Sequence, residues 1–324
     1  MPGDSPIALV VGTAAWVPED ESKLKEIISI MRARNVNILD TALVYGSGAS
    51  EKAIGNLQLG PEISVDTKAP TGFVDGQAAQ IEVFGEQSLA ALQTQKVRTY
   101  FLHGPDTTVP FEEQLEAIQK LYVKGSFERF GISNFSEEQV ISIYDLAKSK
   151  GYVLPTVYQG SYSLVARHHE TGLYLTLRKL GISIEAYSPM AAGFLAKTPE
   201  FIEQGKGNWD PNTFLGKFYR ELFYKPAYMK LLGEFGTLSE KSGISRVGLA
   251  YRWVRHHSFL KSEKGDEMIV GVSSPDHLTN TLDELEGGPL EPWIIQRIEE
   301  LWDLVKDEEP VDNVKSSRKL LALA

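Results

Sequence analysis

The stretch from Thr99 to Asn134 reads TYFLHGPDTTVPFEEQLEAIQKLYVKGSFERFGISN. Two short apolar runs at its ends, TYFLH and FGIS, have the composition of buried strands. The residues between them carry a helical period. The two runs begin about 30 residues apart, which is the length of one strand–helix unit. This stretch therefore predicts two parallel strands joined by a helix.

The same unit recurs along the chain at spacings of roughly 25–35 residues. In an early helical segment, Leu24, Ile27, Ile28 and Met31 occupy positions i, i+3, i+4 and i+7, which form one apolar face. The expected strands are Ile7–Gly12, Asn37–Asp40, Ile63–Thr67, Thr99–His103, Phe130–Ser133, Thr156–Gln159, Ser183–Tyr187 and Met268–Gly271. Eight such strands predict an α/β fold, a closed (β/α)8 TIM barrel, in a single domain over residues 1–324.

An open, doubly wound sheet is the alternative arrangement of such units. That fold usually carries G-x-G-x-x-G between its first strand and helix, and the sequence has neither this pattern nor G-x-x-x-x-G-K-[ST]. Gly46 and Gly48 stand in a different pattern. The missing fingerprints favour the barrel.

Two segments depart from the regular spacing. About 80 residues separate the expected strands seven and eight, and in a barrel this insertion leaves the active-site face. Its part from Asn208 to Pro226 is rich in Asn, Gly, Pro and aromatic residues, which predicts a long loop after strand seven that can close as a lid. The tail after about residue 309 is polar and is expected to be loosely packed.

Composition excludes several classes of protein. The 324 residues carry a net charge of −10 and contain no cysteine. The charge argues against nucleic-acid binding, and the absence of cysteine excludes disulfides and thiolate metal ligands, so no metal site is expected. No apolar run approaches the ~20 residues of a spanning helix, so no membrane association is expected. No secretory signal is visible at the N-terminus, which makes the cytoplasm the expected location.

Polar residues cluster at the ends of the expected strands. Asp40 ends the second strand with Tyr45 after it, Lys68 ends the third, and His103 ends the fourth. Each residue alone is typical of an ordinary cap, brace or surface position. Together they face one mouth of a barrel, where Lys68 can lower the pKa of the Tyr45 phenol, which is about 10 when unperturbed.

This set makes chemical sense as a proton donor to a carbonyl. Asp40 can pair with Lys68, and a neutral His103 can orient the carbonyl by a hydrogen bond. The hydride must come from elsewhere, which implies a nicotinamide cofactor. Ser133, Asn134 and Gln159 suit its carboxamide, and Tyr187 can stack on its ring.

At this point the chain resembles the aldo-keto reductase family. The matching segments include Leu39-Asp40-Thr41-Ala42, Thr67-Lys68, Leu102-His103, Gly131-Ile132-Ser133-Asn134-Phe135 and Ala186-Tyr187-Ser188-Pro189. Late matches, among them Tyr251-Arg252-Trp253 and Gly288-Pro289-Leu290, are most like the aflatoxin-aldehyde reductase branch. The resemblance covers the chain from about Val11 to about Trp302.

The resemblance implies a (β/α)8 barrel that reduces aldehydes or ketones with NADPH. It implies that Tyr45, Asp40, Lys68 and His103 are catalytic, with Tyr45 the proton donor. It places Ser133, Asn134, Gln159 and Tyr187 at the nicotinamide, Ser188, Met190, Ala191 and Gly193 along the pyrophosphate, and Gly271, Ser273, His277 and Thr281 at the adenosine phosphate. The branch also suggests a homodimer.

The phosphate-binding segments depart from the family pattern. Asn212-Thr213-Phe214-Leu215 lacks the arginine that usually precedes an aromatic pair, and Thr281 stands where the family usually has asparagine. The 2′-phosphate is therefore expected either to be bound weakly or to be bound by Lys197, Lys217, Arg220 or Arg246.

Two other functions stay open at the level of sequence. A non-catalytic, NADP(H)-binding regulatory module can share this barrel, since some regulatory relatives keep the same four residues. A Schiff-base aldolase can use a barrel lysine, but Lys68 would then need a lowered pKa, and a neighbouring Asp40 would raise it.

Overall fold

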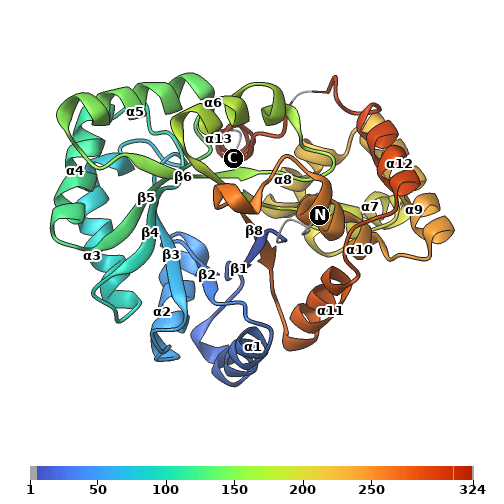
Figure 1. Ribbon diagram of the computed structural model, residues 1–324, viewed down its shortest axis with the longest axis horizontal. Helices are drawn as coiled ribbons and strands as arrows, with labels where there is room; N and C mark the ends of the chain where they lie inside the picture. The colour runs from blue at the N-terminus through green and yellow to red at the C-terminus, as the bar shows by residue number, and fades with distance from the viewer. Residues whose placement is uncertain (1–5, 309, 323–324) are drawn as a thin grey trace.

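The computed structural model describes residues 6–308 and 310–322, and it forms a closed barrel of parallel strands surrounded by helices (Figure 1). The strands follow one another around the barrel in chain order, and β8 pairs with β1 to close it. They are β1 Ala8–Gly12, β2 Ile38–Asp40, β3 Ser64–Ala69, β4 Val97–Leu102, β5 Phe127–Ser133, β6 Pro155–Ser161, β7 Ser183–Tyr187 and β8 Glu267–Gly271. The predicted fold class is confirmed.

The strands β4 and β5 begin two and three residues earlier than predicted, at Val97 and Phe127. Val97 of β4 pairs with Phe127 of β5. The prediction missed these first residues because Arg98 and Arg129 separate them from the apolar runs. Side chains of a barrel strand alternate between the interior and the helix layer, so a polar residue is compatible with the strand when the interior supplies partners. Arg98 has such partners in Asp66 and Glu267, which lie on β3 and β8.

The first six helices alternate with the strands and cover the outside of the barrel (Figure 1). They are α1 Glu21–Ala33, α2 Ala49–Asn56, α3 Ile81–Ala91, α4 Phe111–Val123, α5 Glu137–Lys150 and α6 Leu173–Leu180. Leu24, Ile27, Ile28 and Met31 of α1 are all buried, as their spacing predicts. Apolar side chains from the helices and the outer faces of the strands form one core between the two layers.

The insertion between β7 and β8 differs from the predicted long loop. It is mostly helical, and its helices gather beside β8 at one side of the barrel (Figure 1). They are α7 Pro199–Glu203, α8 Phe214–Phe223, α9 Pro226–Ser242 and α10 Arg246–His257. Its aromatic residues pack on one another: the ring of Phe194 lies 5.7 Å from that of Trp209 and 5.5 Å from that of Phe223. The composition that indicates a loop therefore builds a small aromatic core.

The tail also differs from the expectation of loose packing. After α11 Pro275–Glu286 and α12 Pro292–Trp302, the chain forms α13, Asn313–Leu321, which packs against α8. Arg318 Nε donates to Gly72 O at 2.7 Å, and Lys319 pairs with Glu221 of α8. Val314 packs beside Gly104, in the loop after β4. The tail thus spans from the loops after β3 and β4 to the insertion after β7.

Within the described residues, none of the helices has both the length and the apolar character needed to cross a membrane.

Candidate active site

A cleft of about 860 Å³ opens at the carboxyl ends of the barrel strands, within the size range of small-molecule sites. Its floor and walls come from the ends of most of the strands and from the insertion after β7. The predicted residues that line it are Asp40, Tyr45, His103, Ser133, Asn134, Gln159, Tyr187, Ser188, Met190, Gly193, Gly271, Ser273 and His277. Sequence positions up to 237 residues apart are therefore brought to one cleft, because parallel strands all end on the same rim.

Lys68 lies directly beneath the cleft, fully buried. Its Nζ is 2.6 Å from Oδ1 of Asp40 and donates to the backbone oxygen of Thr41 at 2.7 Å. Burial alone would lower the pKa of Lys68, but the negative charge of Asp40 and its hydrogen bond to Nζ outweigh burial and raise it. Lys68 is thus a fixed cation, which argues against a Schiff-base role because that role needs a neutral amine.

Tyr45 stands in the short turn after β2, with its ring 5.2 Å from Nζ of Lys68. Burial raises the pKa of the Tyr45 phenol above 10, although the charge of Lys68 acts in the opposite direction. Lys68 lowers this pKa, as predicted, but desolvation of the phenolate is the larger effect, so the pKa is raised on balance. The phenol remains protonated at neutral pH.

His103 faces Tyr45 across the cleft floor. The two rings meet edge to face at 5.9 Å, and Phe73 packs on the other side of the imidazole at 4.9 Å. Burial and the charge of Lys68 hold the pKa of His103 well below 6.5. The imidazole is therefore neutral at neutral pH, with one N–H available as a hydrogen-bond donor.

A hydrogen-bonded chain forms the wall of the cleft opposite the β2 end. Asn134 follows β5 in a left-handed conformation (φ 65°), and its Nδ2 donates to His103 O at 2.9 Å. Tyr187 donates its hydroxyl to Oδ1 of Asn134 at 2.7 Å, and Asn313 donates Nδ2 to the Tyr187 oxygen at 2.7 Å. Asparagine adopts this left-handed conformation more readily than most residues, and these hydrogen bonds fix its side chain at the cleft.

The comparisons with known proteins agree with this geometry. Residues 8–303 match the sequence model of the Aldo/keto reductase family. The chain belongs to the aldo-keto reductase family. It is an oxidoreductase that works with a nicotinamide cofactor, as its family and relatives indicate.

Relatives of this aldo-keto reductase match over nearly its full length. The oxidoreductase sirO of Leptosphaeria maculans is 40% identical, over 95% of this chain and 97% of its own. Aflatoxin B1 aldehyde reductase member 2 of Homo sapiens is 36% identical, over 84% of this chain and 79% of its own. The solved structure of a glycerol dehydrogenase from Gluconobacter oxydans superposes with a TM-score of 0.72 at 25% identity, covering 96% of both chains.

The segment that follows β7, residues 188–193, turns tightly and forms part of the cleft wall. Ser188, Ala191 and Ala192 all have left-handed backbones, and a Cβ added to Gly193 would meet no atom within 4 Å. A Cβ added to Gly271, at the end of β8, would likewise meet no atom within 4 Å. Ala191 itself is buried and does not line the cleft, so in this segment the wall is formed by its neighbours.

The end of the cleft that was predicted to bind the adenosine phosphate is formed by β8 and the start of α11. Ser273 and His277 line the cleft there, and Oγ of Ser273 lies 3.2 Å from Nδ1 of His277. Thr281, predicted to bind the cofactor, lies one turn beyond His277 on the same face of α11. It is instead buried and does not line the cleft, because α11 packs against α1 and α10. Its hydroxyl has no hydrogen-bond partner in the described part of the chain.

The four cations proposed to hold a 2′-phosphate lie in different places. Lys197 lines the cleft, with Nζ 4.6 Å from the ring of Phe201. Arg220 donates to Ile202 O at 2.9 Å and Arg246 to Leu232 O at 3.0 Å, so both guanidinium groups support the insertion. Lys217 is exposed and does not line the cleft.

Sequence reasoning missed two polar residues of this region. Asn313 lines the cleft, but it lies in a polar tail that carries no strand or motif to place it. Glu185 lies in β7 and is fully buried. The sequence did contain a signal for Glu185, since its carboxylate stands between Ile184 and Ala186 inside an apolar strand. Buried strands rarely contain an unpaired charge, so such a residue indicates polar partners inside the barrel.

Proposed function

We propose that this chain reduces an aldehyde or ketone to the alcohol, with the hydride from NADPH and the proton from Tyr45. The observation that supports the proposal most directly is the group formed by Tyr45, Lys68, Asp40 and His103 at the cleft floor. A protonated phenol, a fixed cation and a neutral imidazole lie together there. These are the groups needed to protonate a carbonyl oxygen as it gains negative charge.

The residues present fit a nicotinamide. Asn134 and Gln159 offer amide groups at the cleft wall, Tyr187 offers an aromatic ring, and the open volume beside Gly193 and Gly271 leaves room for a long cofactor. When bound, the reduced nicotinamide supplies the hydride. Of the four candidate cations, Lys197 alone lines the cleft, which supports our proposal that it binds a phosphate of NADPH.

Each group at the floor then has a defined part. His103 donates its N–H to the carbonyl oxygen and orients it. Tyr45 transfers its hydroxyl proton to the same oxygen, and the positive charge of Lys68 stabilises the phenolate that remains. Asp40 accepts from Lys68 and holds the ammonium in place. General acid catalysis of this kind contributes about 10²–10⁴-fold to a rate.

The proposal keeps three further expectations from the sequence: a small carbonyl substrate with no nucleic acid, a cytoplasmic location, and assembly as a homodimer. Light scattering on the eluting protein checks the last of these. A single species at the monomer mass of 36.0 kDa would contradict it.

The proposed function is tested by titrating the protein with NADPH and NADH and following the quenching of its tryptophan fluorescence. Aliphatic, aromatic and α-dicarbonyl aldehydes are then added, and the loss of reduced nicotinamide is recorded. We expect NADPH to bind more tightly than NADH and at least one carbonyl class to be reduced. NADPH binding without turnover of any class would support the regulatory module instead, and no binding of either cofactor would refute the proposal.

A further inference from the structure

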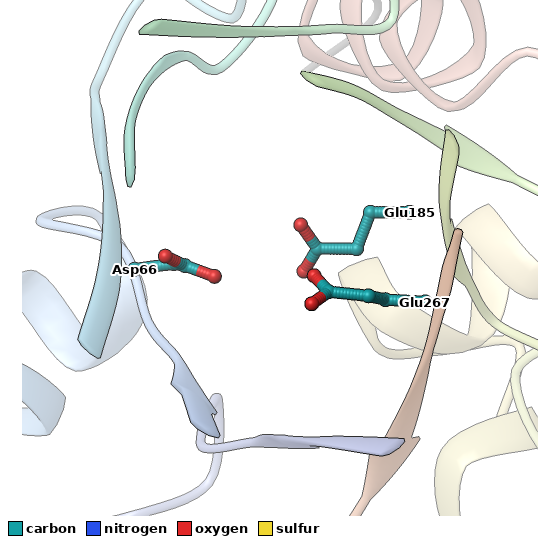
Figure 2. Close-up of side chains that lie close together, drawn as sticks. All are labelled: Asp66, Glu185 and Glu267. Atoms are coloured by element: carbon teal, nitrogen blue, oxygen red, sulfur yellow. The ribbon is translucent and has the colours of Figure 1, made fainter. Parts of the chain in front are cut away.

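Glu185 is a buried carboxyl group that the proposed mechanism does not use. It occupies the centre of β7, and its side chain points into the barrel toward Asp66 of β3 and Glu267 of β8 (Figure 2). One carboxylate oxygen from each of the three residues lies within 4.8 Å of the others. The three acidic groups thus form a layer below the cleft floor.

Arg98 already neutralises this layer. Its Nε donates to Asp66 at 2.9 Å, and its Nη1 and Nη2 donate to Glu267 at 2.7 and 2.9 Å. Arg129 lies 3.7 Å from Glu267 as a second cation. The carboxylates of Asp66 and Glu267 are therefore satisfied by arginine, and the geometry does not call for a metal ion.

The other side of Glu185 faces the cofactor-binding wall. Nε2 of Gln159 donates to Oδ1 of Asp40 at 2.9 Å and to Oε1 of Glu185 at 3.3 Å. Both amide hydrogens of Gln159 are then directed at carboxyl oxygens. The remaining amide atom, Oε1, is left for a donor in the cleft, which Gln159 lines.

The neighbours of Glu185 also fix its protonation. Burial and the nearby charges of Asp66, Asp40 and Glu267 raise the pKa of Glu185 well above 4.5. A neutral carboxylic acid has one hydroxyl donor and one carbonyl acceptor. The carbonyl oxygen, Oε1, accepts from Gln159. The hydroxyl is then on Oε2, which has no hydrogen-bond partner within the described residues and lies on the side of Asp66 and Glu267.

We propose that Glu185 is a positioning residue, which holds the amide of Gln159 with its oxygen toward the cleft so that it accepts a hydrogen bond from the nicotinamide carboxamide. This inference rests on the proposed function. It extends the site by one buried layer, from the cleft wall through Gln159 to β7. Because only the nicotinamide end of the cofactor meets Gln159, the effect of Glu185 should be confined to that end.

The experiment compares Glu185→Met, which removes the acceptor with little change of volume, and Glu185→Gln, which imitates the neutral acid. In the glutamine variant, the amide N–H groups face the carboxylates of Asp66 and Glu267, so the carbonyl again faces Gln159. Dissociation constants are measured for NADPH and for 2′-phospho-ADP-ribose, which lacks the nicotinamide. Thermal melting of each variant reports whether the fold is kept.

We expect Glu185→Met to weaken NADPH binding by about 3- to 10-fold, the usual worth of one neutral hydrogen bond. Binding of 2′-phospho-ADP-ribose should change by less than about 2-fold, and Glu185→Gln should bind NADPH like the wild type. In a double-mutant cycle, Glu185→Met should add little to the loss caused by Gln159→Leu, because both changes remove the same contact.

Three results would overturn the inference. Equal loss of both ligands in Glu185→Met would mean a general structural role. Unchanged NADPH binding would mean that Asp40 alone orients Gln159. Failure of Glu185→Gln to restore binding would mean that charge, not orientation, matters. If the wild type itself binds neither NADPH nor NADH, the proposed function fails first and this inference falls with it.

Discussion

Two opposing effects set the pKa of the Tyr45 phenol. Burial raises its pKa, while the ammonium of Lys68 lowers it. Burial dominates, so the proton is kept until a carbonyl oxygen accepts it. Lys68 is itself held as a cation by Asp40, with no exposed surface. The charge of Lys68 therefore matters most when negative charge forms on the phenol or the substrate.

Lys68→Met tests this balance through the pH profile. Carbonyl reduction needs the protonated phenol, so kcat falls as the pH rises through the pKa of Tyr45. Lys68 lowers that pKa, so its removal should move the alkaline limb to higher pH. The plateau should also fall by about 10²-fold or more, because the phenolate loses its stabilising cation. A variant with an unshifted limb would show that Lys68 does not act on Tyr45.

At this scale, part of the candidate site could be predicted from the sequence. Asp40, Lys68 and His103 could be placed because each ends an apolar run, and the carboxyl ends of parallel strands meet at one rim. The sign of the pKa shift at Tyr45 could not be predicted, since it depends on how completely the fold encloses the phenol. Glu185 was missed for a similar reason: its partners come from three other strands.

Helix α13 is the element that connects the two sides of the cleft mouth. Its first residue, Asn313, binds Tyr187, and Arg318 binds the loop after β3 through Gly72 O and Asp75. On the other side, Lys319 pairs with Glu221 of α8. The contacts of Asn313 and Arg318 hold the tail over residues that we assign to the nicotinamide.

Arg318→Ala should loosen α13 and weaken substrate binding. The half-buried guanidinium loses a hydrogen bond and an ion pair, so we expect KM for the carbonyl to rise about 3- to 10-fold. Hydrogen exchange should accelerate in residues 313–321. Lys319→Ala is the matched control, because its exposed ion pair contributes little. If both variants behave alike, docking of α13 by Arg318 does not shape the substrate site.

Regular elements were easier to predict than the irregular ones. The strands and the helices α1 and α5 follow apolar periodicity and capping residues. Ser136 and Gln139, for example, form a capping box at the start of α5. The insertion and the tail were expected to be loop-like because they are rich in polar, glycine and aromatic residues. Both become helical through contacts with distant parts of the chain, such as Phe223 with Phe194, which local patterns do not reveal.

The whole barrel depends on close packing of neighbouring strands under the cleft. Gly131 of β5 pairs with Phe101 of β4, and a Cβ added to Gly131 would lie 2.3 Å from the Phe101 ring. Phe101 is fully buried, and Nζ of Lys68 lies 5.8 Å from the centre of its ring. The ring therefore has little freedom to move away.

Gly131→Ala should destabilise the molecule by about 1–3 kcal/mol, because it overpacks the strand interface. Urea denaturation should show a lower midpoint with an unchanged slope. Gly233→Ala, in the exposed middle of α9, is the control: its nearest neighbour would be Pro199 at 3.9 Å, and the change should stabilise the helix by up to about 1 kcal/mol. An equally stable Gly131→Ala would contradict the packing argument.

The central claim is that Tyr45 gives the proton and NADPH gives the hydride. Its most direct test is a single-turnover reaction with NADPH deuterated at C4, in the wild type and in Tyr45→Phe, with an aldehyde that the wild type reduces. Both hydrogens at C4 are replaced by deuterium, so that transfer from either face is detected. We predict deuterium in the alcohol formed by the wild type, and a turnover rate at least about 10²-fold lower in Tyr45→Phe. NADPH affinity should be nearly unchanged. A fully active Tyr45→Phe, or an alcohol without deuterium, would contradict the claim.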